Sequence, residues 1–206
     1  MKKRTGAPTD QIILEVAEKL FLEKGFAGTS TIEIARVAGF NQALVHYYFR
    51  TKERLFDAVF ERTACMILAA LFEDPGTEMS LEEEMRRRAD RLYDILKDNP
   101  RMAHFFFNEL NANPERLRGL AGRIGIAAGK LLVKLEEQLA PEIEKGSIRP
   151  VTAMDLFLNL LSIVMVTFLA APVLKELTGM TELDYSHLID ARKRENITVL
   201  LKSLRP

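Results

Sequence analysis

The chain of 206 residues has no tryptophan, a single cysteine and no net charge. With only Cys65 it has neither a disulfide framework nor a cysteine metal cluster, so a reducing compartment is the default expectation. It lacks a Gly-rich phosphate loop and the motifs G-x-S-x-G and H-E-x-x-H, and its three histidines are scattered. The sequence therefore predicts no catalytic residue, no cofactor and no metal site, and it disfavours an enzyme.

Charge is balanced over the whole chain but not along it. Residues 1–55 hold nine basic and six acidic side chains, 9 − 6 = +3, which leaves −3 for the remainder. Three of the nine basic residues are Lys2, Lys3 and Arg4. The asymmetry is mild, but a basic N-terminal part is what a phosphate-binding domain has. No apolar segment follows these first basic residues, so no signal peptide is predicted.

The longest uncharged run covers residues 156–174 and meets the crude length test for a membrane span. Polar residues and a proline interrupt it, and it has no Trp or Tyr at its ends to anchor it at an interface. A helix that is apolar nearly all round also suits the centre of a helical bundle or a dimer interface. We favour that interpretation, and a membrane-tethered protein is the alternative.

Apolar residues recur at helical spacing almost throughout, which predicts an all-α fold. Nine helices are expected, at about residues 9–24, 31–38, 41–49, 52–73, 80–97, 101–111, 113–139, 152–171 and 184–204. Thr9 is expected to cap the first helix, and Ser80-x-x-Glu83 has the pattern of a capping box. A connection is expected from Pro141 to Pro150.

The segment from Thr31 to Tyr48 carries the most information about function. If Thr31 is position one of a helix-turn-helix, Ala35 falls where the two helices cross and only a small side chain fits. Gly39 falls where the turn needs a left-handed backbone. Three further positions must be apolar, and they are occupied by Ile34, Phe40 and Val45. All five positions agree with a DNA-binding helix-turn-helix, and an ordinary helical hairpin is the alternative.

The flanking segments Gly25–Phe40 and Tyr47–Leu55 resemble the tetracycline-repressor (TetR) family of transcriptional regulators. The resemblance includes the spacing A-x-x-L-F-x-x-x-G-F from Ala17 to Phe26. It covers residues 10–60 closely, and beyond them only the order and lengths of the helices are similar. It implies an N-terminal three-helix DNA-binding domain at residues 1–52 and a helical-bundle domain for ligand binding and dimerisation at residues 53–206.

The resemblance also implies roles for single residues, with a recognition helix at Gln42–Tyr48. We expect contacts with base edges in the major groove from Asn41, Gln42 and Ala43, because Gln can pair with adenine and Ala can touch a thymine methyl. We expect contacts with DNA phosphates from Thr29, Thr31, His46, Tyr47 and Lys52. Thr29 or Thr31 could instead only cap the second helix. Tyr48 and Phe49 are expected to pack inside, and the family usually has Tyr where this chain has His46.

The partners implied are double-stranded operator DNA, a small-molecule effector and a second copy of the chain, which binds through the last two helices. We expect a cytoplasmic, nucleoid-associated homodimer on a near-palindromic operator, acting as a repressor. An apolar or amphipathic effector is expected in a pocket lined by Met66, Met102, Phe105, Phe106, Glu109, Asn159 and Ser162. Core packing is the alternative for the aromatic residues, and a surface ion pair for Glu109. A small binding module would explain a pocket and a dimer but not the helix-turn-helix.

Overall fold

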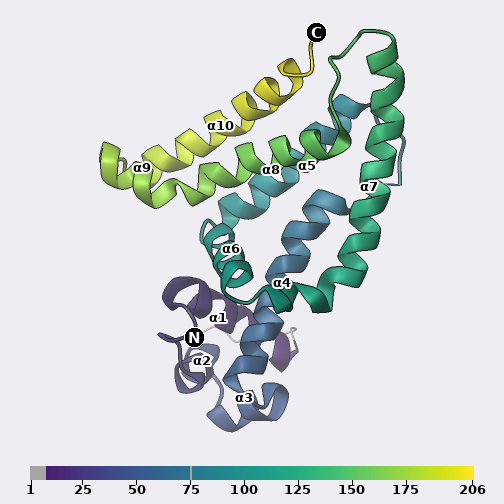
Figure 1. The fold of residues 1–206 in the computed structure, drawn as a ribbon. Helices are drawn as coiled ribbons and strands as arrows, with labels where there is room; N and C mark the ends of the chain where they lie inside the picture. The colour runs from purple at the N-terminus through teal and green to yellow at the C-terminus, as the bar shows by residue number, and fades with distance from the viewer. Residues whose placement is uncertain (1–7, 75) are drawn as a thin grey trace. The chain divides into compact units, whose positions relative to one another are not determined.

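A computed structural model of the chain describes residues 8–74 and 76–206, and Figure 1 shows that they are predominantly helical. The all-α fold expected from the sequence is confirmed. The described residues form α1 Thr9–Lys24, α2 Thr31–Ala38, α3 Gln42–Phe49, α4 Lys52–Phe72, α5 Leu81–Asp98, α6 Met102–Ala112, a 3₁₀ helix at Pro114–Leu117, α7 Arg118–Glu144, α8 Ala153–Leu169, α9 Ala171–Thr178 and α10 Glu182–Lys202.

Three details of the expected helices are wrong. The uncharged run is not one helix, because a short additional helix, α9, follows α8 with Pro172 in its first turn, where proline needs no N–H partner. Helix α7 continues through Pro141 to Glu144. Because Pro141 has no N–H, the carbonyl of Glu137 lacks its hydrogen-bond donor within the helix. Both residues are exposed, so water can reach this part of the helix. Finally, Pro8 rather than Thr9 occupies the N-cap of α1.

The chain divides into two compact units. The first comprises the described residues up to Cys65 together with Phe105–Arg116, and the second comprises Met66–His104 and Leu117–Pro206. Helix α4 supplies residues to both units. The two units are defined by contacts between residues, whereas the boundary expected between residues 52 and 53 separates two functions. That functional boundary stays a prediction.

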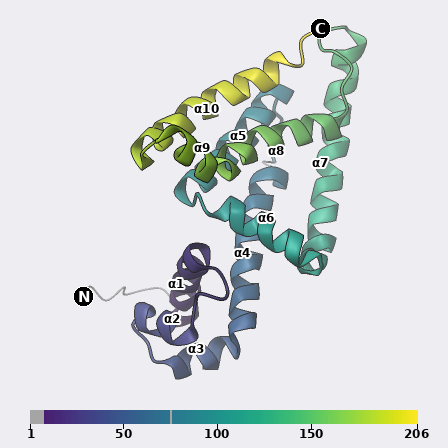
Figure 2. The same cartoon turned by 60° about the vertical axis from the view of Figure 1, so that its left-hand side comes forward.

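The core of the first unit is built from the apolar faces of α1, α2, α3 and the first part of α4. The helix-turn-helix positions Ile34, Ala35 and Val45 are all buried, as the sequence predicts. The ring of Phe21 lies edge-on to that of Phe56, with 4.9 Å between centroids. Helices α2 and α3 thus pack on α1 and on each other, and the contact of Phe21 with Phe56 joins α1 to α4 (Figure 2).

The core of the second unit is where α5, α8 and α10 pack side by side (Figure 1). A buried polar cluster joins the three helices. Asn196 donates to the hydroxyl of Tyr93 and, at 2.9 Å, to the carbonyl oxygen of Ile163. The hydroxyl groups of Tyr93 and Thr167 are 3.2 Å apart. Burial raises the pKa of Tyr185 to about 12, so its hydroxyl keeps the proton that it donates to the carbonyl of Thr167.

No single helix in the described ranges is long and apolar enough to cross a membrane. Taken together, α8 and α9 have the length and the apolar composition of a membrane span, but the two helices are bent by 50° relative to each other.

Candidate nucleic-acid interface

Helix α2 is capped at both of its ends, and α3 is capped at its start. The hydroxyl of Ser30 accepts from the backbone N–H of Glu33 at 3.1 Å, so Ser30 caps α2, rather than Thr29 or Thr31. Gly39 ends α2 with φ 80° and ψ 24°, the left-handed conformation expected from the sequence. The side-chain oxygen of Asn41 then accepts from the N–H of Leu44 at 2.9 Å and caps α3. The caps define where α3 begins and which of its faces is buried.

One face of α3 is free of protein contacts that would bury it. Asn41, Gln42, Ala43, His46 and Tyr47 are all exposed. Residues 42, 43, 46 and 47 share a face because residues three to four apart are neighbours on a helix. The opposite face carries the buried Val45, which holds α3 on the unit. Five of the eight side chains expected at DNA are thus on one accessible surface, which we call the α3 face.

Thr31 and Gln42 lie beside each other across the turn. The side-chain amide of Gln42 donates to the hydroxyl of Thr31 over 3.2 Å. This bond uses one of the two amide N–H groups and leaves the amide oxygen and the second N–H available. It also leaves the proton of the Thr31 hydroxyl free to be donated elsewhere. Thr31 therefore orients the amide that would contact a base.

Two expected roles are not supported. Thr29 is only 2% exposed, and its hydroxyl lies 2.9 Å from the carbonyl oxygen of Gly25 and 3.2 Å from that of Leu20. Its side chain closes the turn after α1 and is not available to a phosphate. Tyr48 does not pack inside: it is 42% exposed, and its ring lies edge-on to that of Tyr47. Phe49 is half-buried.

The connection from α3 to α4 places two further cations near the N-terminus of α4. The ammonium of Lys52 lies 4.2 Å from the centroid of Phe26, a cation–π contact. Arg50 has φ 63° and ψ −56°, and the N–H of Thr51 bonds the carbonyl of Phe49 at 2.7 Å. These are the features of a γ-turn, which is strained for a residue with a side chain. Sequence reasoning missed this turn, because positive φ is expected at Gly or Asn and not at Arg.

The positive charge expected at this end of the chain depends on residues that are not described. Lys2, Lys3 and Arg4 lie outside the described residues. Without them, residues 8–55 hold six basic and six acidic side chains, 6 − 6 = 0. Polar groups at fixed positions, rather than a general excess of cations, characterise the described part of this surface.

The seven residues expected to line an effector pocket are divided between the two compact units. In the first unit, Phe105 lies edge-on to Phe56 and Phe106 stacks on Phe60, with centroids 5.4 and 6.0 Å apart. Glu109 is 3.2 Å from the guanidinium of Arg116. These contacts are core packing and an ion pair. In the second unit Met102 is buried, Met66 is half-buried, and Asn159 and Ser162 are exposed on α8. No cluster of potential metal-ligating side chains occurs in residues 8–74 and 76–206.

Comparison with known proteins places the helix-turn-helix in a family. The family of bacterial regulatory proteins called tetR matches residues 13–59, from α1 into α4. The HTH-type transcriptional regulator RutR of Escherichia coli strain K12 is 23% identical over the whole of this chain and 94% of its own length. The chain belongs to the TetR family of transcriptional regulators. The family assignment makes this protein a DNA-binding regulator, in agreement with the prediction from residues 31–48.

Further relatives agree with the TetR assignment. The HTH-type transcriptional repressor BepR of Brucella suis is 31% identical over 40% of this chain and 42% of its own. A solved tetR-family protein from Rhodococcus RHA1 has the same fold, with a TM-score of 0.68 over 97% of this chain and 98% of its own at 18% identity. The similarity to this TetR-family structure thus extends over both compact units.

Proposed function

We propose that this TetR-family regulator is a homodimeric repressor. It binds a near-palindromic operator through the α3 face and leaves it when a small apolar or amphipathic molecule binds. Residues 1–52 act as the DNA-binding domain and residues 53–206 as the domain for effector binding and dimerisation. The protein works in the cytoplasm, at the nucleoid. The observation that carries the proposal is the exposed α3 face, capped at Asn41 and packed through Val45.

Base recognition is assigned to the start of α3. The amide of Gln42, held by Thr31, has an acceptor and a donor left, which matches the N6–H and N7 of adenine. Asn41 keeps its amide N–H groups free while its oxygen caps the helix. Ala43 adds a methyl group for a thymine. Phosphates are contacted by Thr31, His46, Tyr47 and Lys52, and these contacts set the position of α3 in the groove.

Dimerisation is assigned to α8 and α10. On α8, exposed Met154, Leu158, Ser162 and Val166 recur every fourth residue and so form one stripe. A largely apolar stripe that one chain leaves exposed is suited to a protein interface. Pairing of α8 and α10 with the same helices of a second copy forms a four-helix bundle. The pair of recognition helices then meets two half-sites related by two-fold symmetry.

Effector response requires a difference in affinity between two conformations. An effector that binds better to the conformation with the wrong spacing of recognition helices lowers operator affinity by that difference. Helix α4 is the element proposed to carry the change, because it contributes residues to both compact units.

A gel shift with DNA flanking the gene, at two salt concentrations, tests the DNA-binding assignment. The double variant Tyr47→Ala, Lys52→Gln should bind at least ~10-fold more weakly while remaining folded, since Tyr47 is exposed and the half-buried Lys52 loses only its contact with the Phe26 ring. Lys19→Gln, which removes an exposed cation from α1, is the control and should bind like the native chain. Equal losses in the double variant and the control would contradict the assignment of the α3 face.

A further inference from the structure

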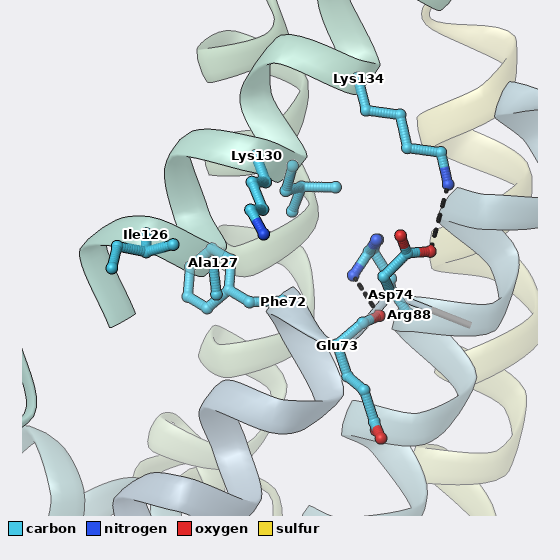
Figure 3. A pocket seen from close by; sticks show the side chains of 9 residues that line it. Phe72, Glu73, Asp74, Arg88, Ile126, Ala127, Lys130 and Lys134 are labelled. Carbon is cyan, nitrogen blue, oxygen red and sulfur yellow. Dashed lines mark hydrogen bonds and ion pairs between the residues drawn. The ribbon is translucent and has the colours of Figure 1, made fainter. Parts of the chain in front are cut away.

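A pocket of about 290 Å³ lies within the second unit, between the C-terminal end of α4, α5 and α7 (Figure 3). This volume is at the lower end of the range of small-molecule sites. One wall is apolar and consists of Phe72, Ile126, Ala127 and Leu131. The rest is charged, with Arg88 from α5, Lys130 and Lys134 from α7, and the acidic residues Glu73 and Asp74 after the end of α4. The pocket thus combines an apolar surface with three cations and two carboxylates.

Two of these cations are already neutralised. Arg88 is 2% exposed, pairs with the buried Glu84, and donates to the carbonyl oxygens of Leu71 and Glu73 at the end of α4. Lys134 lies 3.2 Å from a carboxylate oxygen of Glu84.

Lys134 also lies 3.6 Å from a carboxylate oxygen of Asp74. The N–H of Gly76, and after it the ammonium of Lys134, lower the pKa of Asp74, so this carboxyl is ionised at neutral pH. Glu73 is engaged elsewhere, 2.6 Å from Arg91. Arg88 and Lys134 are therefore balanced by Glu84 and Asp74.

Lys130 is the cation left over. No hydrogen bond or ion pair joins it to another residue in the described part of the chain, and Figure 3 shows its ammonium pointing in among the residues that line the pocket. With Arg88 and Lys134 matched by two carboxylates, the balance is 3 − 2 = +1. In addition, the buried Nε–H of Arg88 has no acceptor among the described residues. Lys130 is also exposed, so its ammonium is accessible to a ligand from solution. An accessible, unmatched cation beside an apolar wall suits an anion that carries an apolar body.

We propose that this pocket binds a small monocarboxylate with an aromatic or branched aliphatic body. Its carboxylate pairs with the Lys130 ammonium in the field of Arg88, and its body lies against Phe72, Ile126 and Leu131. The inference rests on the proposed function in one respect, that this ligand is the effector. It narrows the effector from an apolar or amphipathic molecule to an anionic one, and it places the site on residues that sequence reasoning did not single out.

Binding can be tested without DNA. The full chain is titrated by isothermal calorimetry with benzoate, phenylacetate and 4-methylpentanoate, and in parallel with the neutral amides of the same three acids. At least one acid is expected to bind, and at least ~10-fold more tightly than its amide, because a charge-assisted bond is roughly twice as strong as a neutral one. Binding of no acid at concentrations up to ~10 mM, where a Kd of 1 mM is readily seen, or equal binding of acids and amides, would overturn the proposal.

The site is assigned with Lys130→Met, which keeps the length of the side chain and removes its charge. It should lower affinity for the acid at least ~10-fold and leave the amide unaffected. Lys202→Met, at an exposed position near the end of α10, is the matched control and should change neither. Unchanged binding of the acid by Lys130→Met would overturn the assignment even if the acid binds elsewhere.

A separate gel shift distinguishes this proposal from the proposed function. If the acid weakens operator binding of the native chain but not of Lys130→Met, the result supports both the pocket and its role as the effector site. Calorimetric binding with no effect on operator affinity supports the site and contradicts its role as effector site. Operator binding with no calorimetric signal from any acid overturns the site and leaves the DNA-binding function intact.

Discussion

Replacing Thr31 by valine should weaken operator binding without weakening the fold. Valine keeps the shape and removes the hydroxyl that accepts from the Gln42 amide over 3.2 Å. Because Ser30 supplies the cap of α2, the variant does not lose that cap. Its melting temperature should therefore stay close to that of the native chain.

The size of the effect follows from the two bonds that the hydroxyl makes in the complex. The bond to Gln42 is also present in the free protein, so it adds to affinity only by holding the amide in the orientation that binds DNA, which contributes ~0.5 kcal/mol. The proposed bond to a phosphate contributes about 1 kcal/mol. Together they give roughly 1.5 kcal/mol for each recognition helix and roughly 3 kcal/mol for a dimer, or about 100-fold in Kd. Thr31→Ser, which keeps the hydroxyl, should recover most of the affinity.

Fluorescence anisotropy at several salt concentrations measures this effect and identifies its origin. Thr31 carries no charge, so the slope of log K against log [salt] should not change in Thr31→Val. In Lys52→Gln the slope should become shallower by ~0.9 for each lost phosphate contact, or ~1.8 in a dimer. Operator affinity within ~3-fold of native in Thr31→Val, well below the loss expected from these bonds, would refute the role of its hydroxyl in orienting Gln42 and contacting phosphate.

Three further predictions concern the scaffold. Gly39→Ala should lower the free energy of unfolding in urea by about 1 kcal/mol, because φ is 80° but no atom lies within 4 Å of the added methyl; Gly28→Ala should cost more, because its Cβ would lie 2.5 Å from the carbonyl oxygen of Lys24, and the reverse order would contradict this account. Leu158→Glu, on the exposed stripe of α8, should shift the protein from dimer to monomer in sedimentation velocity, whereas an unchanged dimer would exclude this stripe as the interface. Asn196→Leu should lower the free energy of unfolding by ~2 kcal/mol, since it removes the amide that donates to the buried Tyr93 hydroxyl, and a loss below ~0.5 kcal/mol would show that the cluster is dispensable.

The parts of the fold that the sequence predicts well are those with local signals. The end of α2 follows from Gly39, because a left-handed backbone is most favourable without a side chain. Its extent follows from the apolar positions that face α1. The capping box of Ser80 and Glu83 marks the start of α5 correctly for the same reason. Such signals involve residues within four positions of one another, so they do not depend on contacts with distant parts of the chain.

The errors come from residues whose role depends on distant partners. Pro172 looks like an interruption in sequence, but it stands in the first turn of α9. Tyr48 looks like a core residue, yet the buried positions are taken by other side chains and its ring lies against Tyr47 at the surface. The density of aromatic residues around Phe106 suggests a pocket, but Phe60 on α4 fills the space against it.

The charged pocket of the second unit is the least predictable feature. Arg88 and Lys130 are 42 residues apart in sequence and come together only through the packing of α5, α7 and the end of α4. The one local signal is that Lys130 and Lys134 stand four residues apart on a helix face that also carries Leu131. That spacing is equally typical of a solvated helix surface, so only the structure shows that one cation is matched by carboxylates and the other is not.

Selection of bound sequences from a random DNA library measures directly whether the α3 face recognises an operator. We expect enrichment of two inverted half-sites, with centres about 34 Å or a multiple of that distance apart, because a two-fold dimer presents two copies of α3. Binding to the selected DNA should exceed binding to a scrambled sequence by at least ~10³-fold at physiological salt. Enrichment of no motif, with equal affinity for both DNAs, would contradict the claim that the α3 face recognises an operator.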